Sequence, residues 1–359
     1  MTSQKAAAND FPKIDSHIHL YAASHIPSLR WTGGLDEQHV LNRQCSVEEY
    51  KLATQHDNTV QGFVFLETDR KSDLGQDHWQ NALDEVDFLV RVAKGTPRDG
   101  EGHQSVDAKL VLAIIPWAPV AAGERLLATY VDRVRQQCGE EFDLVKGFRY
   151  LLQDKPSGTM LQHHLIEGLQ WLGKNDFTFD LGVDARSGGL HQLEEACEMM
   201  DRVYEEDSGL KIIINHFCKP NLRLSPDEAF AGHSEFIKWK QCIERMARHR
   251  SAYMKLSGFF SELPPQTSDM PSNISIIAEH MKPWVDVVFA AFTPRRIMFG
   301  SDWPVCNVGG PSIKSSWPHW RAVVEAILES EGLDVEEKAM IWSGTATEAY
   351  GIRPTLSGL

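Results

Sequence analysis

The sequence predicts an α/β fold, a single-domain (β/α)8 or TIM barrel, on three observations. Eight short apolar runs recur along the chain, and segments of helical length separate them. Nearly all of these runs are rich in Val, Ile, Phe and Leu on both faces, which is typical of strands buried in a parallel sheet. The chain has 359 residues, enough for a barrel, which takes about 250 or more. A doubly wound open sheet is the competing fold, but it usually has fewer strands.

The expected elements alternate from the first strand to the last. The expected strands are 13–20, 60–68, 109–117, 144–152, 177–184, 211–217, 252–258 and 296–302. Apolar residues at helical spacing predict helices over 79–94, 121–138, 161–172, 190–204, 235–250 and 320–329. Ser225 and Pro226 predict a further helix start, because Ser is a good N-cap and Pro fits the first helical position.

Two connections between strands are longer than the rest. Residues 21–59 and 257–295 both follow a strand, so they are expected on the catalytic face of a barrel, as parts of a lid. No repeat or low-complexity linker interrupts the chain. We therefore expect a flexible N-terminal tail over 1–10 and one barrel domain over 11–359.

Charge and cysteine content restrict the partners and the compartment. Lys and Arg number 36 and Asp and Glu 50, so the net charge is −14. An acidic surface without basic clusters argues against nucleic acid and anionic membranes, though it leaves a small anionic ligand open. The 6 cysteines are scattered without a C-x-x-C pair, which predicts reduced, mostly buried thiols. With no signal peptide and no run of about 20 apolar residues, we expect a soluble cytoplasmic protein.

The sharpest chemical pattern is His17-Ile18-His19 on the first strand. Strand side chains alternate, so the two histidines point to the same face. At the carboxyl end of a barrel strand that face borders the active-site pocket, where two imidazoles can share a metal or a substrate oxygen. The alternative is that both histidines are hydrogen-bonded core residues without a functional role.

Asp302 ends the eighth strand, in MFGSDWP. Strand eight pairs with strand one in a closed barrel, so Asp302 is expected beside His17 and His19. A metal ligand or a general base fits that position. His216 ends the sixth strand and is expected to orient or protonate the substrate, or to polarise its carbonyl; a helix-capping or core histidine is the alternative.

Five further residues are candidates for substrate binding. Arg149 lies in the apolar fourth strand, where a guanidinium either pairs with a carboxylate or binds substrate oxygens. Glu67 ends the second strand and is a candidate site residue or a partner for nearby cations. Trp117, Trp31 and Trp303 are candidates for an apolar wall against a sugar ring, although Trp is also a common core residue. No G-x-G-x-x-G motif, P-loop or G-x-S-x-G elbow occurs, so no organic cofactor is expected.

Six blocks of the chain resemble the amidohydrolase-related barrel family. They are IDSHIHL, KGFRYLLQ, IINHFCKP, YMKLSGF, RIMFGSDWPV and GTATEAYGI, in that order between Ile14 and Ile352. More narrowly, they are similar to the lactonase branch of that family, and the first loop with SLRWTGG, together with SVEEY and LETDRKSD, resembles its fungal members.

The resemblance implies that His17, His19, His216 and Asp302 are the catalytic residues. It implies that His17, His19 and Asp302 are the ligands if one divalent metal, Zn²⁺ or Mn²⁺, is bound. Metal-dependent relatives usually carry another histidine at the end of strand five, where this chain reads FTFDLGVD, which argues against a binuclear site. Members of the lactonase branch are often described as needing no divalent metal, so the metal requirement stays open.

The function that the resemblance implies is hydrolysis of a small-molecule sugar-acid lactone, with L-rhamnono-1,4-lactone converted to L-rhamnonate. One alternative is a metal-dependent decarboxylase or amide hydrolase on the same barrel. The other is a non-catalytic binding or scaffold barrel. The sequence leaves a homo-oligomer open.

Overall fold

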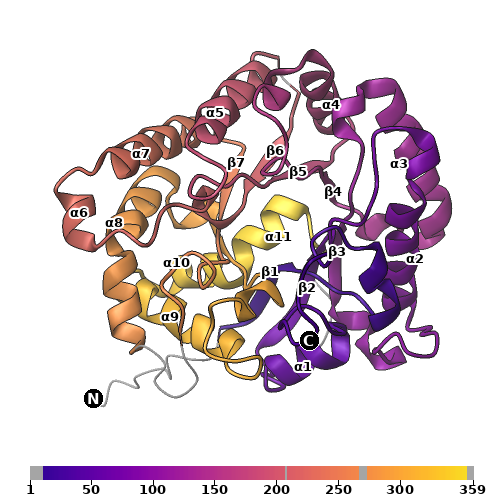
Figure 1. Cartoon of the computed structure of the whole chain (residues 1–359), viewed down its shortest axis with the longest axis horizontal. Coiled ribbons are helices and arrows are strands. Elements are labelled where there is room, and N and C mark those ends of the chain that lie inside the picture. The colour runs from indigo at the N-terminus through magenta and orange to yellow at the C-terminus, as the bar shows by residue number, and fades with distance from the viewer. Residues whose placement is uncertain (1–10, 207, 267–272, 354–359) are drawn as a thin grey trace.

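The computed structural model describes residues 11–206, 208–266 and 273–353. The tail predicted over 1–10 lies outside these residues. Eight parallel strands alternate with helices along the chain (Figure 1). The strands are β1 (Lys13–Ile18), β2 (Val60–Leu66), β3 (Val111–Ile115), β4 (Gly147–Arg149), β5 (Thr178–Leu181), β6 (Lys211–Ile214), β7 (Ala252–Leu256) and β8 (Ile297–Phe299).

The strands pair in chain order, with one sheet of β1-β2-β3 and another of β4-β5-β6-β7-β8. Isolated parallel bridges join the two sheets at both seams. Ile114 bridges Val145 on one side, and Ile18 bridges Trp303 on the other. The predicted (β/α)8 barrel is therefore confirmed, with isolated bridges rather than continuous ladders where the two sheets meet.

The helices surround the strands (Figure 1). They are α1 (Val47–Ala53), α2 (Gln80–Lys94), α3 (Glu124–Cys138), α4 (His163–Lys174), α5 (His191–Tyr204), α6 (Pro226–Phe230), α7 (Ser234–Ala247), α8 (Ile274–Phe292), α9 (Ser316–Ser330), α10 (Val335–Ala339) and α11 (Thr345–Tyr350). All six predicted helices occur within a few residues of their expected bounds. The Ser225 cap is also confirmed, because its hydroxyl accepts from the Glu228 N–H.

One expectation about connections is wrong. The segment 257–295 is not one long loop, because α8 occupies residues 274–292. Helix α8 is unusually apolar and contains Pro283, and for these two reasons the sequence pattern did not predict a helix here. The connection 21–59 holds short 3-10 turns and α1.

The core has two parts. The larger one fills the space between strands and outer helices, and the smaller one fills the barrel interior. Ala346, Ala349 and Tyr350 of α11 belong to the interior cluster, so this helix closes one end of the barrel. Figure 1 shows α11 at the centre of the ring.

All six cysteines are free and buried, as expected from their scatter. Among the helices in the described parts of the chain, none has the length and apolar character required to span a membrane.

Candidate active site

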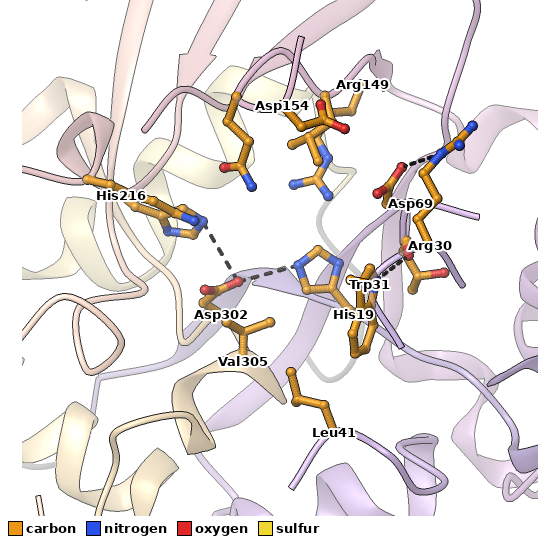
Figure 2. A pocket seen from close by; sticks show the side chains of 14 residues that line it. His19, Arg30, Trp31, Leu41, Asp69, Arg149, Asp154, His216, Asp302 and Val305 are labelled. Atoms are coloured by element: carbon orange, nitrogen blue, oxygen red, sulfur yellow. Dashed lines mark hydrogen bonds and ion pairs between the residues drawn. The ribbon is translucent and has the colours of Figure 1, made fainter. Parts of the chain in front are cut away.

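A cavity of about 460 Å³ lies at the carboxyl ends of the strands (Figure 2). This is the end of a barrel at which the loops after the strands converge. The residues that line the cavity are His19, Arg30, Trp31, Leu41, Thr68, Asp69, Arg149, Leu151, Gln153, Asp154, His216, Lys219, Asp302 and Val305.

The β1–β8 seam brings Asp302 to the two histidines of strand one. The Asp302 N–H donates to the His17 carbonyl at 2.9 Å, and the His19 N–H donates to the Trp303 carbonyl at 2.7 Å. The Nε2 atoms of His17 and His19 each lie 3.4 Å from Asp302 Oδ1. The adjacency predicted from strand order is therefore confirmed.

His216 reaches the same carboxylate through an unusual turn. His216, Phe217, Cys218 and Lys219 all have positive φ, from 48° to 60°, which non-glycine residues rarely adopt. The turn directs the His216 ring towards the cavity, with Nε2 3.8 Å from Asp302 Oδ1 (Figure 2). It also places Lys219 in the cavity wall. Four consecutive left-handed residues are typical of strain held at a functional site.

A glycine opposite this turn makes room for it. Gly258 follows β7 with φ of 72°, and a Cβ there would lie 2.4 Å from His216 Nδ1 and 2.9 Å from an Asp302 oxygen. The neighbouring Ser257 hydroxyl contacts His216 Nδ1 at 2.8 Å. A side chain at position 258 would therefore push the imidazole away from the carboxylate.

The groups around Asp302 favour its ionised form. Burial alone would raise the pKa of this carboxyl, but His216, His19 and Lys219 outweigh it and lower the pKa below the usual value. Burial lowers the pKa of His216 to about 3 and that of His17 well below its usual range, with Lys255 adding to the effect at His17. The centre therefore combines a carboxylate with neutral imidazoles at His17 and His216 at neutral pH.

Arg149 lines the cavity and pairs with Glu67 behind it. The Arg149 Nε lies 2.6 Å from Glu67 Oε1, and its Nη2 donates to the Glu67 carbonyl at 2.9 Å. Glu67 is fully buried and is not among the residues that line the cavity, so the structure shows it as a partner of a nearby cation, one of the two roles expected for it. It orients the guanidinium, whose donors face the cavity in Figure 2.

The expected wall of three tryptophans does not form. Trp31 lines the cavity and donates its indole N–H to the Thr68 carbonyl at 2.8 Å. Trp117 is buried among Tyr130 and Tyr150. Trp303 packs against Tyr50 beneath the seam. The strand ends point these two indoles into the core, which sequence alternation alone did not resolve.

Several cavity residues that sequence reasoning missed come from loops. Arg30 and Asp69 form an ion pair at 3.5 Å in the wall. Burial, and then the nearby Glu67, raise the pKa of Asp69 to about 7. Asp154 and Lys219 add two further charges. Polar residues in loops carry little positional signal, because loop conformation rather than strand alternation decides where they point.

A second group of charges lies inside the barrel, and its lysine was missed in the sequence. Lys255 of β7 and Asp180 of β5 are both fully buried and lie 2.7 Å apart. Tyr350 of α11 donates its hydroxyl to Asp180 at 2.9–3.0 Å. A signal was available, since a lysine between Met254 and Leu256 is as costly in a buried strand as Arg149 is.

His17, His19 and Asp302 could hold a metal ion, because one ligand atom from each lies within 4.8 Å of the others. Two imidazoles and a carboxylate suit Zn²⁺ or Mn²⁺. The buried His17 Nε2 lacks a hydrogen-bond partner in the described part of the chain, so it is free to meet a ligand. The donor set therefore fits and supports divalent-metal binding.

The chain matches a known protein family along nearly its whole length. The family described as Amidohydrolase matches residues 14–352. The chain is 37% identical over 346 residues to an L-rhamnono-gamma-lactonase of Scheffersomyces stipitis, covering 94% of this chain and 98% of that protein. It is 26% identical over 271 residues to an L-fucono-1,5-lactonase of Burkholderia multivorans, covering 75% and 77%.

A solved structure confirms the fold. It is a Burkholderia multivorans amidohydrolase with bound zinc, with a TM-score of 0.67 and 23% identity, covering 95% of this chain and 99% of that one. At this identity the likeness shows the fold alone.

Proposed function

Because the chain belongs to the amidohydrolase family, we propose that it hydrolyses a sugar-acid lactone, with L-rhamnono-1,4-lactone as substrate and L-rhamnonate as product. The observation that carries the proposal is the Asp302 carboxylate at the cavity. Three imidazole Nε2 atoms lie within 3.8 Å of one of its oxygens. A ring ester needs an activated water and a stabilised oxyanion, and this cluster supplies both kinds of group.

In the first step, Asp302 accepts a proton from water as the oxygen attacks the lactone carbonyl carbon. The lowered pKa of this buried carboxyl keeps it in the basic form. The carbonyl electrons move to the former carbonyl oxygen, which becomes an oxyanion. N–H groups of the imidazoles around Asp302 donate hydrogen bonds to this oxyanion.

In the second step, the tetrahedral intermediate collapses and the bond to the ring oxygen breaks. Asp302, now a carboxylic acid, returns its proton to that oxygen, which leaves as a hydroxyl group. The product is an open-chain hydroxy acid. No covalent enzyme intermediate is required, which agrees with the lack of a serine elbow in the sequence.

A divalent metal, for which Zn²⁺ and Mn²⁺ are our proposed identities, would be held by His17, His19 and Asp302. When bound, it would supply Lewis-acid polarisation of the carbonyl and a lower pKa for water.

The cavity has two kinds of wall that suit a deoxy-sugar lactone. Arg149 and Asp154 lie on one side, and Trp31, Leu41 and Val305 gather on the other (Figure 2). Charged groups can hydrogen-bond ring hydroxyls, and the apolar side can pack against a methyl group.

The test is proton release on a panel of aldonolactones that includes L-rhamnono-1,4-lactone, using chelator-treated protein with and without added Zn²⁺ or Mn²⁺. Opening of one deoxy-sugar lactone by the chelated protein supports the proposal with a dispensable metal. Recovery only on metal addition supports it with His17, His19 and Asp302 as ligands. Inactivity on every lactone in all conditions would contradict it and favour the decarboxylase, amide-hydrolase or non-catalytic alternative.

Cytoplasmic location and a possible homo-oligomer stay predictions from the sequence. Fractionation of the source cells checks the first, and light scattering from the purified protein checks the second.

A further inference from the structure

The Lys255–Asp180 ion pair has no role in the mechanism above, yet it sits in an apolar barrel interior. Lys255 and Asp180 are both 0% exposed. Apolar side chains from several strands, with Ile213 and Met298 among them, fill the same interior. A buried ion pair is often no more stabilising than apolar residues of the same volume. A role beyond stability is therefore worth seeking in what the pair contacts.

The contact that matters is with His17. Lys255 Nζ lies 2.7 Å from Asp180 Oδ1 and 3.3 Å from His17 Nδ1. Asp180 accepts hydrogen bonds from both Lys255 and Tyr350, as expected of a carboxylate, so its partner keeps the ammonium form. An ammonium group can only donate, so His17 Nδ1 must accept. The proton of a neutral His17 ring then lies on Nε2.

His19 has the opposite arrangement. Its Nδ1 lies 3.0 Å from the carbonyl oxygens of Leu66 and Glu67. Carbonyl oxygens only accept, so His19 Nδ1 carries a proton. The two histidines of one H-x-H pattern therefore differ at Nδ1, where His17 accepts and His19 donates.

We propose that Lys255 is a positioning residue that holds the His17 proton on Nε2, so that His17 serves as a hydrogen-bond donor beside Asp302. The His17 Nε2 is buried and lacks a hydrogen-bond partner among the described residues, which suits a donor that meets an oxyanion only during the reaction. Metal binding through this atom requires the ring proton to move to Nδ1, which the Lys255 ammonium group opposes. The assignment of catalytic roles rests on the proposed lactonase function, whereas the tautomers do not.

The experiment is NMR of the metal-free full chain with ¹⁵N-labelled histidine rings, at one neutral pH. His17→Gln and His19→Gln assign the two rings. In the wild type we expect a protonated Nε2 in His17 and a protonated Nδ1 in His19. Protonation of His17 at Nδ1 in the wild type would overturn the proposal, whatever the variants do.

The matched variants are Lys255→Met/Asp180→Asn, which removes both charges together, and Tyr350→Phe, which loosens the same network without touching His17. We expect the double variant to move the His17 proton wholly or partly to Nδ1, and Tyr350→Phe to leave it on Nε2. An unchanged His17 in the folded double variant, or the same shift in Tyr350→Phe, would contradict the positioning role.

Kinetics on the lactone that the wild type opens supply a second readout. Loss of a residue that orients an active-site histidine typically costs roughly 10–100-fold. We expect a loss of that size in kcat for the double variant, with KM nearly unchanged, and an equal rise in KM would contradict the role. If the wild type opens no lactone, the proposed function fails while the NMR result still decides the tautomers.

Discussion

Two buried aspartates on either side of the β1–β8 seam have opposite surroundings. Asp15 accepts from the Ser301 N–H at 2.7 Å and from the Ser301, Trp317 and Tyr50 side chains at 2.6, 2.9 and 3.1 Å. Asp302 has imidazoles around it and borders the cavity. Burial raises the pKa of Asp15 despite its donors. At Asp302 burial is outweighed and the pKa is lowered.

The comparison separates a structural carboxylate from a reactive one. Donors from rigid elements surround Asp15, so none of its oxygens faces a substrate. Asp302 has partners that themselves exchange protons, and it is open to the cavity. Burial is nearly equal for the two, at 0% and 3% exposed, so the kind of partner and not the depth distinguishes them.

The largest expected effect is loss of turnover in Asp302→Asn. General acid–base catalysis by one group is worth about 10²–10⁴-fold, and Asp302 serves as base and acid in turn. We therefore expect kcat to fall by at least about 10³-fold, or roughly 4 kcal/mol. Initial rates on the lactone check this, and circular dichroism checks the fold. Turnover within tenfold of the wild type would remove Asp302 from the catalytic role.

Asp15→Asn is the matched control, and we expect it to lower stability instead of turnover. An amide can accept from only one side, so one donor at the seam meets an NH₂ group instead of an oxygen. A buried polar group left unsatisfied costs about 1–3 kcal/mol. We expect a loss of that size in the free energy of unfolding, measured with urea, and little change in turnover per folded molecule. If kcat falls as far as in Asp302→Asn, the distinction between the two aspartates is wrong.

Asp69 is intermediate between Asp15 and Asp302, because it lines the cavity as Asp302 does but has a raised pKa as Asp15 does. Burial and Glu67 raise its pKa from 3.8 to about 7. Between these values the folded state holds a proton that the unfolded state lacks, so stability falls as pH rises. The slope for one proton is at most about 1.4 kcal/mol per pH unit. Asp69→Asn should remove this slope in unfolding experiments from pH 4 to 7, and parallel curves for both proteins would contradict it.

The smallest expected effect concerns the apolar side of the cavity. Val305→Thr keeps the shape of the side chain and adds a hydroxyl group. L-Mannono-1,4-lactone differs from the L-rhamnono lactone by a hydroxyl on the terminal carbon. We expect the ratio of kcat/KM for the two lactones to shift towards the mannono lactone by less than about tenfold. A matched Leu151→Met change should leave the ratio unaltered, and an equal shift in both variants would argue against a methyl subsite at Val305.

The parts of the site that follow from strand order were predictable. Strand alternation and the pairing of strands one and eight are enough to bring His17, His19 and Asp302 together. The wall residues were not predictable, because Arg30, Asp69 and Asp154 lie on loops whose paths depend on tertiary contacts. The turn at His216–Lys219 is the clearest case. Its four residues have positive φ, but none is a glycine, the residue type from which such a turn is usually predicted.

Residue type alone led us to expect too many tryptophans in the cavity wall. Trp117 and Trp303 resemble a sugar-binding wall in sequence, but large aromatic side chains gain most from burial and these two lie in the core. Lys255 is easily overlooked inside an apolar strand, although the cost of a buried cation applies to it as it does to Arg149. Buried charges in strands are thus the better signal of an organised site.

The β1–β8 seam also determines when the site forms during folding. Ser301 and Asp15, which meet there, are 286 residues apart in the chain. Contacts this distant demand the closure of nearly the whole polypeptide, and such contacts are slow to form. A chain still emerging from the ribosome therefore has its histidines long before its aspartate. Catalytic competence in this barrel arrives only with the last strand, and regain of activity reports on completed folding.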